Sequence, residues 1–365
     1  MSKNKPNLNA PRLLIVEGDG IGPEIVASTL EVLKAADAAT GIGFEYDTAL
    51  VGFAALAKSG TTFPDAVVEA AKRADGIILG PVSHNEYPPV DKGGPNPSGR
   101  MRKHLDLYAN IRPAKSYPGF APRCGKELDL VICRENTEGF YADRNMFMGL
   151  GEFMPTEDLA LSVRKVSRKG STRIVETAFR LAMKRRKKLT VVHKANVLRI
   201  SDGLFLECAR EVAKSFPEVA YEEKIVDAMA ALLVRDAGMF DVIVTTNMFG
   251  DILSDQATEI SGSIGLAASI NAGDNYALAQ AQHGSAPDIA GKNIANPASL
   301  IGSTAMLLSW MSERRNDPRL QKAADLMQGA LEKTIVVPEW RTGDMGGPLG
   351  TREFGARVAA NIGAA

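Results

Sequence analysis

The sequence has few cysteines and no excess of charge of either sign. Its three cysteines, Cys124, Cys133 and Cys208, are widely spaced and form no CxxC pair. This pattern argues against a disulfide framework and against a zinc site built on cysteine, and we expect reduced thiols. With 43 acidic and 43 basic residues, no general field attracts nucleic acid or a membrane, so any anion must be recognised locally.

Long apolar runs are also missing. No stretch approaches the roughly twenty residues that a membrane-spanning helix needs. The opening segment, MSKNKPNLNAPR, lacks the apolar centre of a secretory signal, so we expect a cytoplasmic protein. Hydrophobic residues nevertheless make up 45% of the 365 residues. A chain of this length and composition can bury a full core and is expected to divide into two domains.

Strand and helix patterns alternate from the start of the chain. Residues 12–36 predict a strand, a glycine turn and a helix that starts near Pro23. Further strand patterns lie at 74–82, 128–135, 189–196 and 240–247, and a helix pattern lies at 174–188. The alternation predicts an α/β fold. Between 144 and 171, glycines and methionines break the rhythm, and we interpret this segment as an inserted arm whose apolar residues need a partner surface.

Two local patterns are weak guides to function. Gly18, Gly20 and Gly22 resemble a dinucleotide-binding turn, but Pro23 stands at the final glycine position of the GxGxxG pattern. The basic run Lys184–Lys188 ends a predicted amphipathic helix, where cations stabilise the helix end. We therefore interpret it as a solvated helix end rather than as a nucleic-acid site.

Three aspartates, Asp227, Asp251 and Asp255, suggest a metal site. The apolar run 240–246 predicts a buried strand that leads into a helix, and ligand sites in open α/β sheets favour that edge. Asp251 and Asp255 are four residues apart, so on a helix their carboxylates share one face and can share a divalent cation. Oxygen ligands suit Mg²⁺ or Mn²⁺ rather than zinc. Spacing alone also allows another interpretation, in which the acids cap the helix start.

Cationic and proton-carrying residues supply further chemistry. Arg102, Arg112 and Arg134 lie beside apolar runs that predict strands or strand ends, and the planar guanidinium fork binds carboxylates, although each could instead form a structural ion pair. Lys194, at the end of a predicted strand, and Tyr141 could transfer protons near a metal. Together these residues suggest chemistry on a metal-chelated hydroxy acid or keto acid.

In this order the segments resemble the β-decarboxylating dehydrogenases, the isocitrate and 3-isopropylmalate dehydrogenase family. The matching stretches cover nearly the whole chain and are GDGIGPEI, RKHLDLYANIRP, RENTEGFY, HKANVL, VDAMA, NMFGDILSD, HGSAPDIAGKNIANP and GDMGG. The resemblance implies a non-Rossmann, two-domain α/β fold. Residues 1–107 and 262–365 would form the cofactor-binding first domain. Residues 108–261 would form the second, with the dimer interface and an arm at about 145–168 that clasps another subunit.

The resemblance also implies a reaction and a role for each residue. The family's reaction is NAD-dependent oxidative decarboxylation of a 3-substituted malate, with hydride passing to the nicotinamide and Mg²⁺ or Mn²⁺ stabilising the enolate left by CO₂. The family's third metal aspartate and its lysine come from the neighbouring subunit, so a complete site would require a homodimer or a dimer-based oligomer. The matching residues are Arg102, Arg112 and Arg134 for substrate carboxylates, Lys194 for the hydroxyl proton, Tyr141 for the enol proton, and Asp227, Asp251 and Asp255 for the metal.

Cofactor choice follows from the HGSAPD segment. Asp288 stands where NAD-using members place an acid that accepts hydrogen bonds from the adenosine ribose, so a 2′-phosphate would be repelled and NADP rejected. Asn296 resembles the residue that contacts adenine. The segment AQAQHG departs from the Glu-Pro pair that many relatives carry there. The implied cofactor residues are His283, Gly284, Ser285, Ala286, Asp288 and Asn296.

The substrate's variable group is expected to meet Asn96 and Ser98. Isopropylmalate enzymes usually have leucines before the first arginine, whereas this chain has polar residues, which favour an isocitrate-like substrate. The alternatives are 3-isopropylmalate, tartrate or another malate. A silent regulatory subunit is a remote alternative that the retained Tyr141 and Lys194 argue against. A nucleic-acid or scaffold role on the same fold is disfavoured by the zero net charge and by the lack of aromatics interleaved with basic residues.

Overall fold

The computed structural model describes residues 9–141, 146, 148–149 and 151–363. Most of the polar opening segment, and Asn145 at the start of the predicted arm, lie outside the described residues. The chain divides into two compact units. Unit 1 comprises Met1–Leu105, Tyr117–Ala121 and Ser263–Ala365, and unit 2 comprises Asp106–Ser116 and Pro122–Gly262.

Unit 1 is built on a mostly parallel sheet. Within it the strands lie in the order β2, β1, β3, β12 and β11, and β11 runs antiparallel to β12. Strands β1 and β3 are almost wholly buried and apolar, as expected for central strands covered on both faces. The bounds are β1 (Arg12–Val16), β2 (Glu45–Thr48), β3 (Gly76–Leu79), β11 (Ile270–Ala272) and β12 (Ala277–Gln280).

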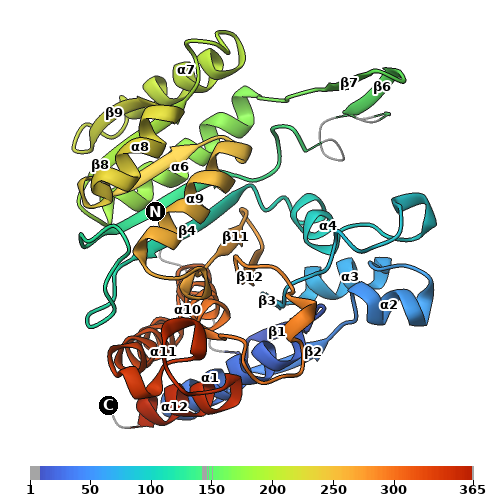
Figure 1. Cartoon of the computed structure of the whole chain (residues 1–365), viewed down its shortest axis with the longest axis vertical. Coiled ribbons are helices and arrows are strands. Elements are labelled where there is room, and N and C mark those ends of the chain that lie inside the picture. Colours follow the sequence, from blue (N-terminus) through green and yellow to red (C-terminus); the bar gives the residue numbers. More distant parts are fainter. Residues whose placement is uncertain (1–8, 142–145, 147, 150, 364–365) are drawn as a thin grey trace. The chain divides into compact units, whose positions relative to one another are not determined.

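Helices cover the sheet of unit 1. Helix α1 packs against α11 and α12, and α10 packs against β3 and β12 (Figure 1). Helix α1 has Pro23 in its first turn and ends at Gly41, whose left-handed φ of 63° lets its N–H reach Asp37 O. The α-helices are α1 (Gly22–Thr40), α2 (Gly52–Ser59), α3 (Asp65–Arg73), α4 (Pro97–His104), α10 (Ala298–Arg315), α11 (Pro318–Val336) and α12 (Thr351–Gly363). The short 3₁₀ helices are η1 (Val90–Lys92), η3 (Ile264–Leu266), η4 (Pro287–Ile289), η5 (Pro338–Trp340) and η6 (Gly343–Met345).

Within unit 2 the strands lie in the order β4, β5, β10, β8 and β9, with β4 antiparallel to β5 and the other pairs parallel. Val242 and Val244 of β10 pack with α6 and α7, whereas Ile243 packs with α8 and α9. Alternate residues therefore fill two cores, one on each face of the sheet. The bounds are β4 (Ala109–Lys115), β5 (Asp129–Glu135), β8 (Lys188–His193), β9 (Ala220–Ile225), β10 (Val242–Thr245), α6 (Arg168–Met183), α7 (Ser201–Ala213), α8 (Val226–Asp236), η2 (Ala237–Met239) and α9 (Asn247–Ser261).

The predicted α/β fold is confirmed. An antiparallel hairpin, β6 (Glu152–Thr156) and β7 (Leu159–Ser162), is exposed at every residue (Figure 1). Its contact with a second subunit stays a prediction, as do the roles assigned to the two domains. In the part of the chain that the structure describes, no helix is both long and apolar enough to cross a membrane.

The basic run differs from its prediction. Helix α6 ends at Met183, so the run lies after the helix rather than in its last turn. Arg185 pairs with Asp129 and with the buried Asp241, both at 2.8 Å. Lys184, Arg186 and Lys187 are exposed directly after the helix, so the run is solvated there, while Arg185 also fastens this loop to two aspartates.

Candidate functional site

Asp251 and Asp255 lie on one face of helix α9. The helix begins at Asn247, soon after strand β10, and has no acidic residue in its first turn. The two aspartates therefore do not cap the helix, which was the alternative interpretation of their spacing. Both carboxylates accept from the same nitrogen, Arg112 Nη1, at 3.1 and 3.2 Å, as expected for residues four apart on a helix.

Two buried arginines face these carboxylates. Arg112 lies on β4 and Arg134 on β5, with 7% and 2% of their side-chain surfaces exposed. Arg134 Nη1 pairs with Asp251. Burial and, next, the neighbouring Arg134 cation lower the pKa of Arg112 to about 10, while Asp251 and Asp255 act in the opposite sense. Arg112 therefore stays charged at neutral pH, and two cations face two half-exposed carboxylates.

The phenol of Tyr141 joins this cluster. Arg134 Nη2 donates to Tyr141 Oη at 2.6 Å, and the phenol donates to Asp251 Oδ2 at 3.4 Å. Because the guanidinium occupies a lone pair of the phenol oxygen, the phenol proton remains available to a group beside Asp251. The structure thus brings together Arg112, Arg134, Tyr141, Asp251 and Asp255.

Lys194 and Asp227 form a separate pair. Lys194 follows β8, and Asp227 lies in the first turn of α8. Their ion pair lowers the pKa of Asp227, chiefly through the hydrogen bond from Lys194. The backbone N–H of Lys194 donates to the buried Asp202 at 2.6 Å. Among the described residues, no three His, Cys, Asp or Glu side chains are grouped to hold a metal ion, so Asp227 does not join Asp251 and Asp255 within one chain.

The Asp251 and Asp255 pair fits a hard divalent cation. The two side chains offer only oxygen atoms, and 42% and 51% of their surfaces are exposed. Mg²⁺ usually takes one or two protein carboxylates and keeps water or substrate oxygens as its other ligands. An open pair of carboxylates is therefore a suitable protein contribution to a metal site that a substrate completes.

The predicted cofactor residues lie between β12 and α10 in unit 1. Asp288 is exposed in η4, and Gly284 is exposed before it. His283 Nδ1 donates to Gly284 O at 3.0 Å, and its buried Nε2 has no hydrogen-bond partner among the described residues. Burial lowers the pKa of His283, so the ring is neutral at pH 7 and Nε2 is an acceptor. A buried acceptor without a partner in the described part of the chain fits a site that a polar ligand completes.

Three other residues of this segment are held in place by the structure of unit 1. Ser285 is buried, and Ala286 has a left-handed φ of 38°. Asn296 Nδ2 donates to Asp344 at 3.0 Å, while its Oδ1 accepts from the N–H of Ala298 at 3.0 Å. These contacts shape the loop before α10, and contact of Asn296 with adenine stays a prediction.

The glycine turn after β1 contacts the predicted cofactor segment. Ile21 N donates to Ser285 O at 2.8 Å, and Ser285 Oγ lies 2.7 Å from Ser83 Oγ. Gly20 has a φ of 57°, and a Cβ there would lie 2.0 Å from Ser285 O. Glycine is required for this approach. Sequence analysis missed the role, although closely spaced glycines are the signal for such a backbone contact.

If the predicted cofactor segment binds NAD, Gly20→Ala should raise the KM for NAD about tenfold or more, because Ser285 must shift away from the new methyl group. The left-handed backbone adds strain of about 1–3 kcal/mol to the free energy of folding. Gly41→Ala is the matched control, since Gly41 has a φ of 63° and nothing within 4 Å of its Cβ position. Kinetics and thermal unfolding compare the two variants. An equal effect on KM in both would contradict the role assigned to Gly20.

Asn96 and Ser98 have partners inside unit 1. Asn96 is the N-cap of α4, and its Oδ1 accepts from Gly99 N at 3.2 Å. The buried Ser98 donates to Gln280 Oε1 at 2.8 Å. Asparagine followed by proline is a local signal for a helix start, which the sequence interpretation did not use. Arg102 lies in the last turn of α4, so its predicted place beside a strand was wrong.

An α/β chain with oxygen ligands for a metal, buried arginines and a proton-carrying phenol has the features of metal-dependent enzymes that act on small carboxylic acids. The model of the isocitrate/isopropylmalate dehydrogenase family matches residues 12–358, and the chain belongs to this family.

Relatives of the chain span nearly its whole length. It is 41% identical over 340 residues to a 3-isopropylmalate dehydrogenase of Sulfurisphaera tokodaii, covering 93% of this chain and 96% of that protein. It is 42% identical over 348 residues to an isocitrate/homoisocitrate dehydrogenase of Thermus thermophilus, covering 94% and 96%. The crystal structure of isocitrate dehydrogenase from Methylococcus capsulatus is similar, with a TM-score of 0.85, 39% identity, and coverage of 96% and 99%.

Family membership confirms the predicted reaction class and cofactors. Enzymes of this family are decarboxylating dehydrogenases that use NAD and a Mg²⁺ or Mn²⁺ ion. The protein is therefore an NAD-dependent, metal-requiring enzyme that oxidises and decarboxylates a small malate-type hydroxy acid. Because its relatives differ in substrate, the substituent on the malate must be argued from this chain's own residues.

Proposed function

We propose that the substrate is a malate with a small polar or anionic group on its third carbon, as in isocitrate. The observation that carries the proposal is the cluster in unit 2 where two buried arginines, a phenol and two carboxylates converge. Such a cluster suits a small acid that carries several negative charges. The polar residues at the start of α4 support a polar or anionic group on the third carbon.

The arginines would bind the carboxylates of the substrate. Arg112 and Arg134 are already desolvated, and charge-assisted hydrogen bonds from a buried guanidinium are strong. Arg102 would add a third contact. When bound, the metal ion neutralises charge that develops on the substrate oxygens, and NAD accepts the hydride.

Two side chains would move protons. Lys194, as the neutral amine, would take the proton of the substrate hydroxyl while hydride leaves the carbon that bears it, and Tyr141 would give a proton to the enol carbon after CO₂ departs. Arg134 Nη2 would keep its hydrogen bond to the oxygen of Tyr141 during this transfer and so hold the phenol in place. Asp227, which contacts Lys194 Nζ, would contribute a third carboxylate to the metal.

We further infer that the working enzyme is a homodimer. Lys194 and Asp227 form a pair of their own, away from a three-ligand group with Asp251 and Asp255, so one chain supplies an incomplete site. The exposed apolar residues Phe153 and Met154 of the hairpin suit a surface that another subunit covers. A two-fold dimer would exchange Lys194 and Asp227 between its sites.

Asp288 favours NAD over NADP. Its carboxylate is exposed and can accept hydrogen bonds from a ribose, whereas a 2′-phosphate would meet a like charge. His283 Nε2 would accept a hydrogen bond from the cofactor.

The start of α4 favours a polar substituent. The Ser98 hydroxyl is buried, and its partner Gln280 is a neutral amide, so this contact places no fixed negative charge against an anionic group. An isopropyl group packed against the same polar atoms would remove their water without offering a hydrogen bond in its place.

Purified protein with Mg²⁺ and NAD should turn over isocitrate with a kcat/KM about tenfold or more above that for 3-isopropylmalate, since a charge-assisted contact contributes roughly 1.5–3 kcal/mol. Malate and tartrate complete the panel, and a parallel series replaces NAD with NADP. NADH formation is followed by absorbance. A preference for 3-isopropylmalate would refute the proposed polar or anionic group on the third carbon. If none of these acids yields NADH, the proposed function is refuted.

A further inference from the structure

We propose that Asn247 is a positioning residue for this reaction and acts through Arg134 on Tyr141. The inference rests on the proposed function, because it explains how the proposed substrate arginine is held. Asn247 is the first residue of α9 and is completely buried. A buried amide must satisfy both its oxygen and its nitrogen, and here each side meets a different segment of the chain.

The oxygen of Asn247 holds one edge of the Arg134 guanidinium. Oδ1 accepts from Arg134 Nε at 2.9 Å and from Nη2 at 2.7 Å. The same Nη2 donates to Tyr141 Oη at 2.6 Å. Two bonds to one oxygen fix the plane of the guanidinium, so the direction in which Nη2 meets the phenol is fixed as well.

One turn of α9 surrounds Arg134. Asn247 bonds the Nε edge of the guanidinium, and Asp251 pairs with Nη1 on the other side. Gly250 lies against the stem, where a Cβ would come within 2.6 Å of Arg134 Cγ. The helix that carries Asp251 and Asp255 therefore also sets the position of the arginine. Asn247 is the residue of this turn that the sequence did not indicate as part of the site.

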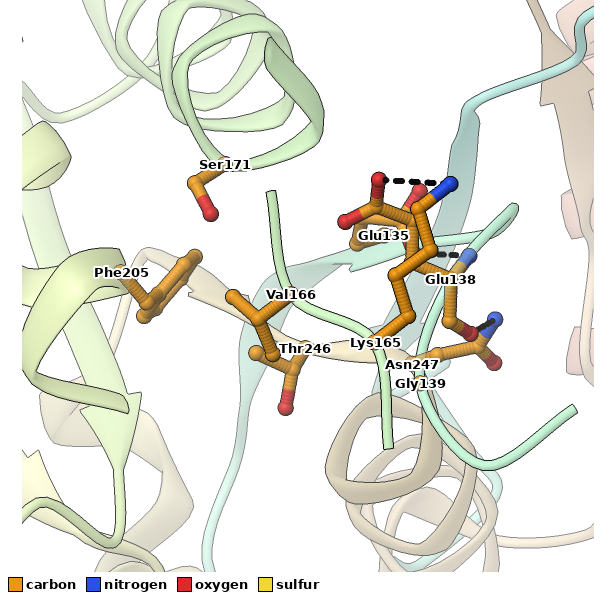
Figure 2. Close-up of a pocket in the computed structure, with 9 residues that line it drawn as sticks. All are labelled: Glu135, Glu138, Gly139, Lys165, Val166, Ser171, Phe205, Thr246 and Asn247. Atoms are coloured by element: carbon orange, nitrogen blue, oxygen red, sulfur yellow. Dashed lines mark hydrogen bonds and ion pairs between the residues drawn. The ribbon is translucent and has the colours of Figure 1, made fainter. Parts of the chain in front are cut away.

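The nitrogen of Asn247 is tied to a fixed point. Nδ2 donates to Glu138 O at 2.9 Å, as the dashed line between these residues in Figure 2 shows. The Glu138 carboxylate accepts from Ser167 N at 2.7 Å and Ser167 Oγ at 2.5 Å, at the start of α6. A Cβ at Gly170 would come within 2.7 Å of that carboxylate. Asn247 thus connects a well-fastened backbone segment to Arg134.

Two substitutions separate the two sides of the amide. Asn247→Ala removes the bonds to Arg134 and to Glu138. Asn247→Asp keeps an acceptor for Arg134 but cannot donate to Glu138. If Asn247 acts through Arg134, the aspartate variant retains part of the function that the alanine variant loses; if it only supports the backbone at Glu138, both variants lose the same amount.

Thr245→Val is the matched control. Thr245 is buried on β10, close to Asn247 in the sequence, and its Oγ1 donates to Val192 O at 2.8 Å. Its loss removes a buried hydrogen bond that does not involve the Arg134 guanidinium, although Thr245 is the neighbour of Arg134 in the pairing of β10 with β5. For all variants, isocitrate and 3-isopropylmalate binding is measured by calorimetry with Mg²⁺ in the absence of NAD, together with KM, kcat and thermal unfolding.

We expect Asn247→Ala to lower kcat/KM about 100-fold, because small misplacements of a binding group have effects of this size. The factor should be the same for both acids, since Arg134 would bind a carboxylate that they share. The KM for NAD should stay within about twofold of wild type. Asn247→Asp should fall between wild type and Asn247→Ala, and Thr245→Val should lower only the Tm.

Equal losses of kcat/KM in the aspartate and alanine variants would overturn the inference. A loss of kcat/KM in Thr245→Val as large as that in Asn247→Ala would overturn it as well. If the wild type binds neither acid, the proposed function fails. If the wild type binds them and Asn247→Ala binds them as tightly, only the role of Asn247 fails.

Discussion

Asp251→Asn should lower NADH formation about 1,000-fold or more, because a metal ion that stabilises charge in the transition state contributes several kcal/mol and the variant lacks one of its charged ligands. The fold should persist, since an asparagine still accepts hydrogen bonds from Arg112 and Arg134, and Asp255 still pairs with Arg112. Steady-state rates, Mn²⁺ binding by calorimetry and thermal unfolding measure the three parts of this expectation.

Glu259→Gln is the matched control for Asp251→Asn. Glu259 lies on the same helix, and its exposed ion pair with Arg123 contributes little to stability. Its loss removes a charge from α9 without touching the cluster, and both the rate and Mn²⁺ binding should remain. Excess chelator should stop the wild-type reaction, and added Mg²⁺ or Mn²⁺ should restore it. Undiminished turnover in excess chelator would refute the metal role of Asp251.

Local patterns in the sequence predicted the parts of the site that a single element determines. Asp251 and Asp255 share a face because helix geometry brings residues four apart together, whatever the rest of the chain does. The apolar run of β10 likewise predicted a buried strand, since both of its faces meet apolar cores. The helix start at Asn96 was equally local, yet the sequence interpretation did not include the cap that this side chain forms.

Contacts between distant segments could not be predicted in this way. Asn247 meets Arg134 across 113 residues, and Ser98 meets Gln280 across 182. A buried amide or hydroxyl is matched to a partner on another element, and no periodicity in its own segment indicates which one. The glycine turn at Gly20 is intermediate, because the glycines indicate a close approach but not its partner.

Mixing Lys194→Ala with Tyr141→Phe should restore activity that neither variant has alone. Each substitution removes a proton-transfer group, so each homodimer should lose activity about 100- to 10,000-fold. If a site combines Tyr141 of one subunit with Lys194 of the other, a mixed dimer contains one intact site and one site that lacks both groups. With free exchange of subunits at equal concentrations, about one quarter of the wild-type activity should return.

The ion pair between Lys194 and Asp227 supplies the control for this mixture. Because the two side chains belong to the same half of the site, a mixed dimer of Lys194→Ala and Asp227→Asn has no intact site, and activity should not return. A site built from a single chain would behave differently, since no pair of these variants would then restore activity.

Subunit exchange is verified by native mass spectrometry, and sedimentation gives the oligomeric state. A fully active monomer would refute the shared site, and so would verified exchange between the Lys194 and Tyr141 variants without restored turnover. Activity in the first mixture but not in the second would show that each site takes Lys194 and Asp227 from one subunit and Tyr141 from the other.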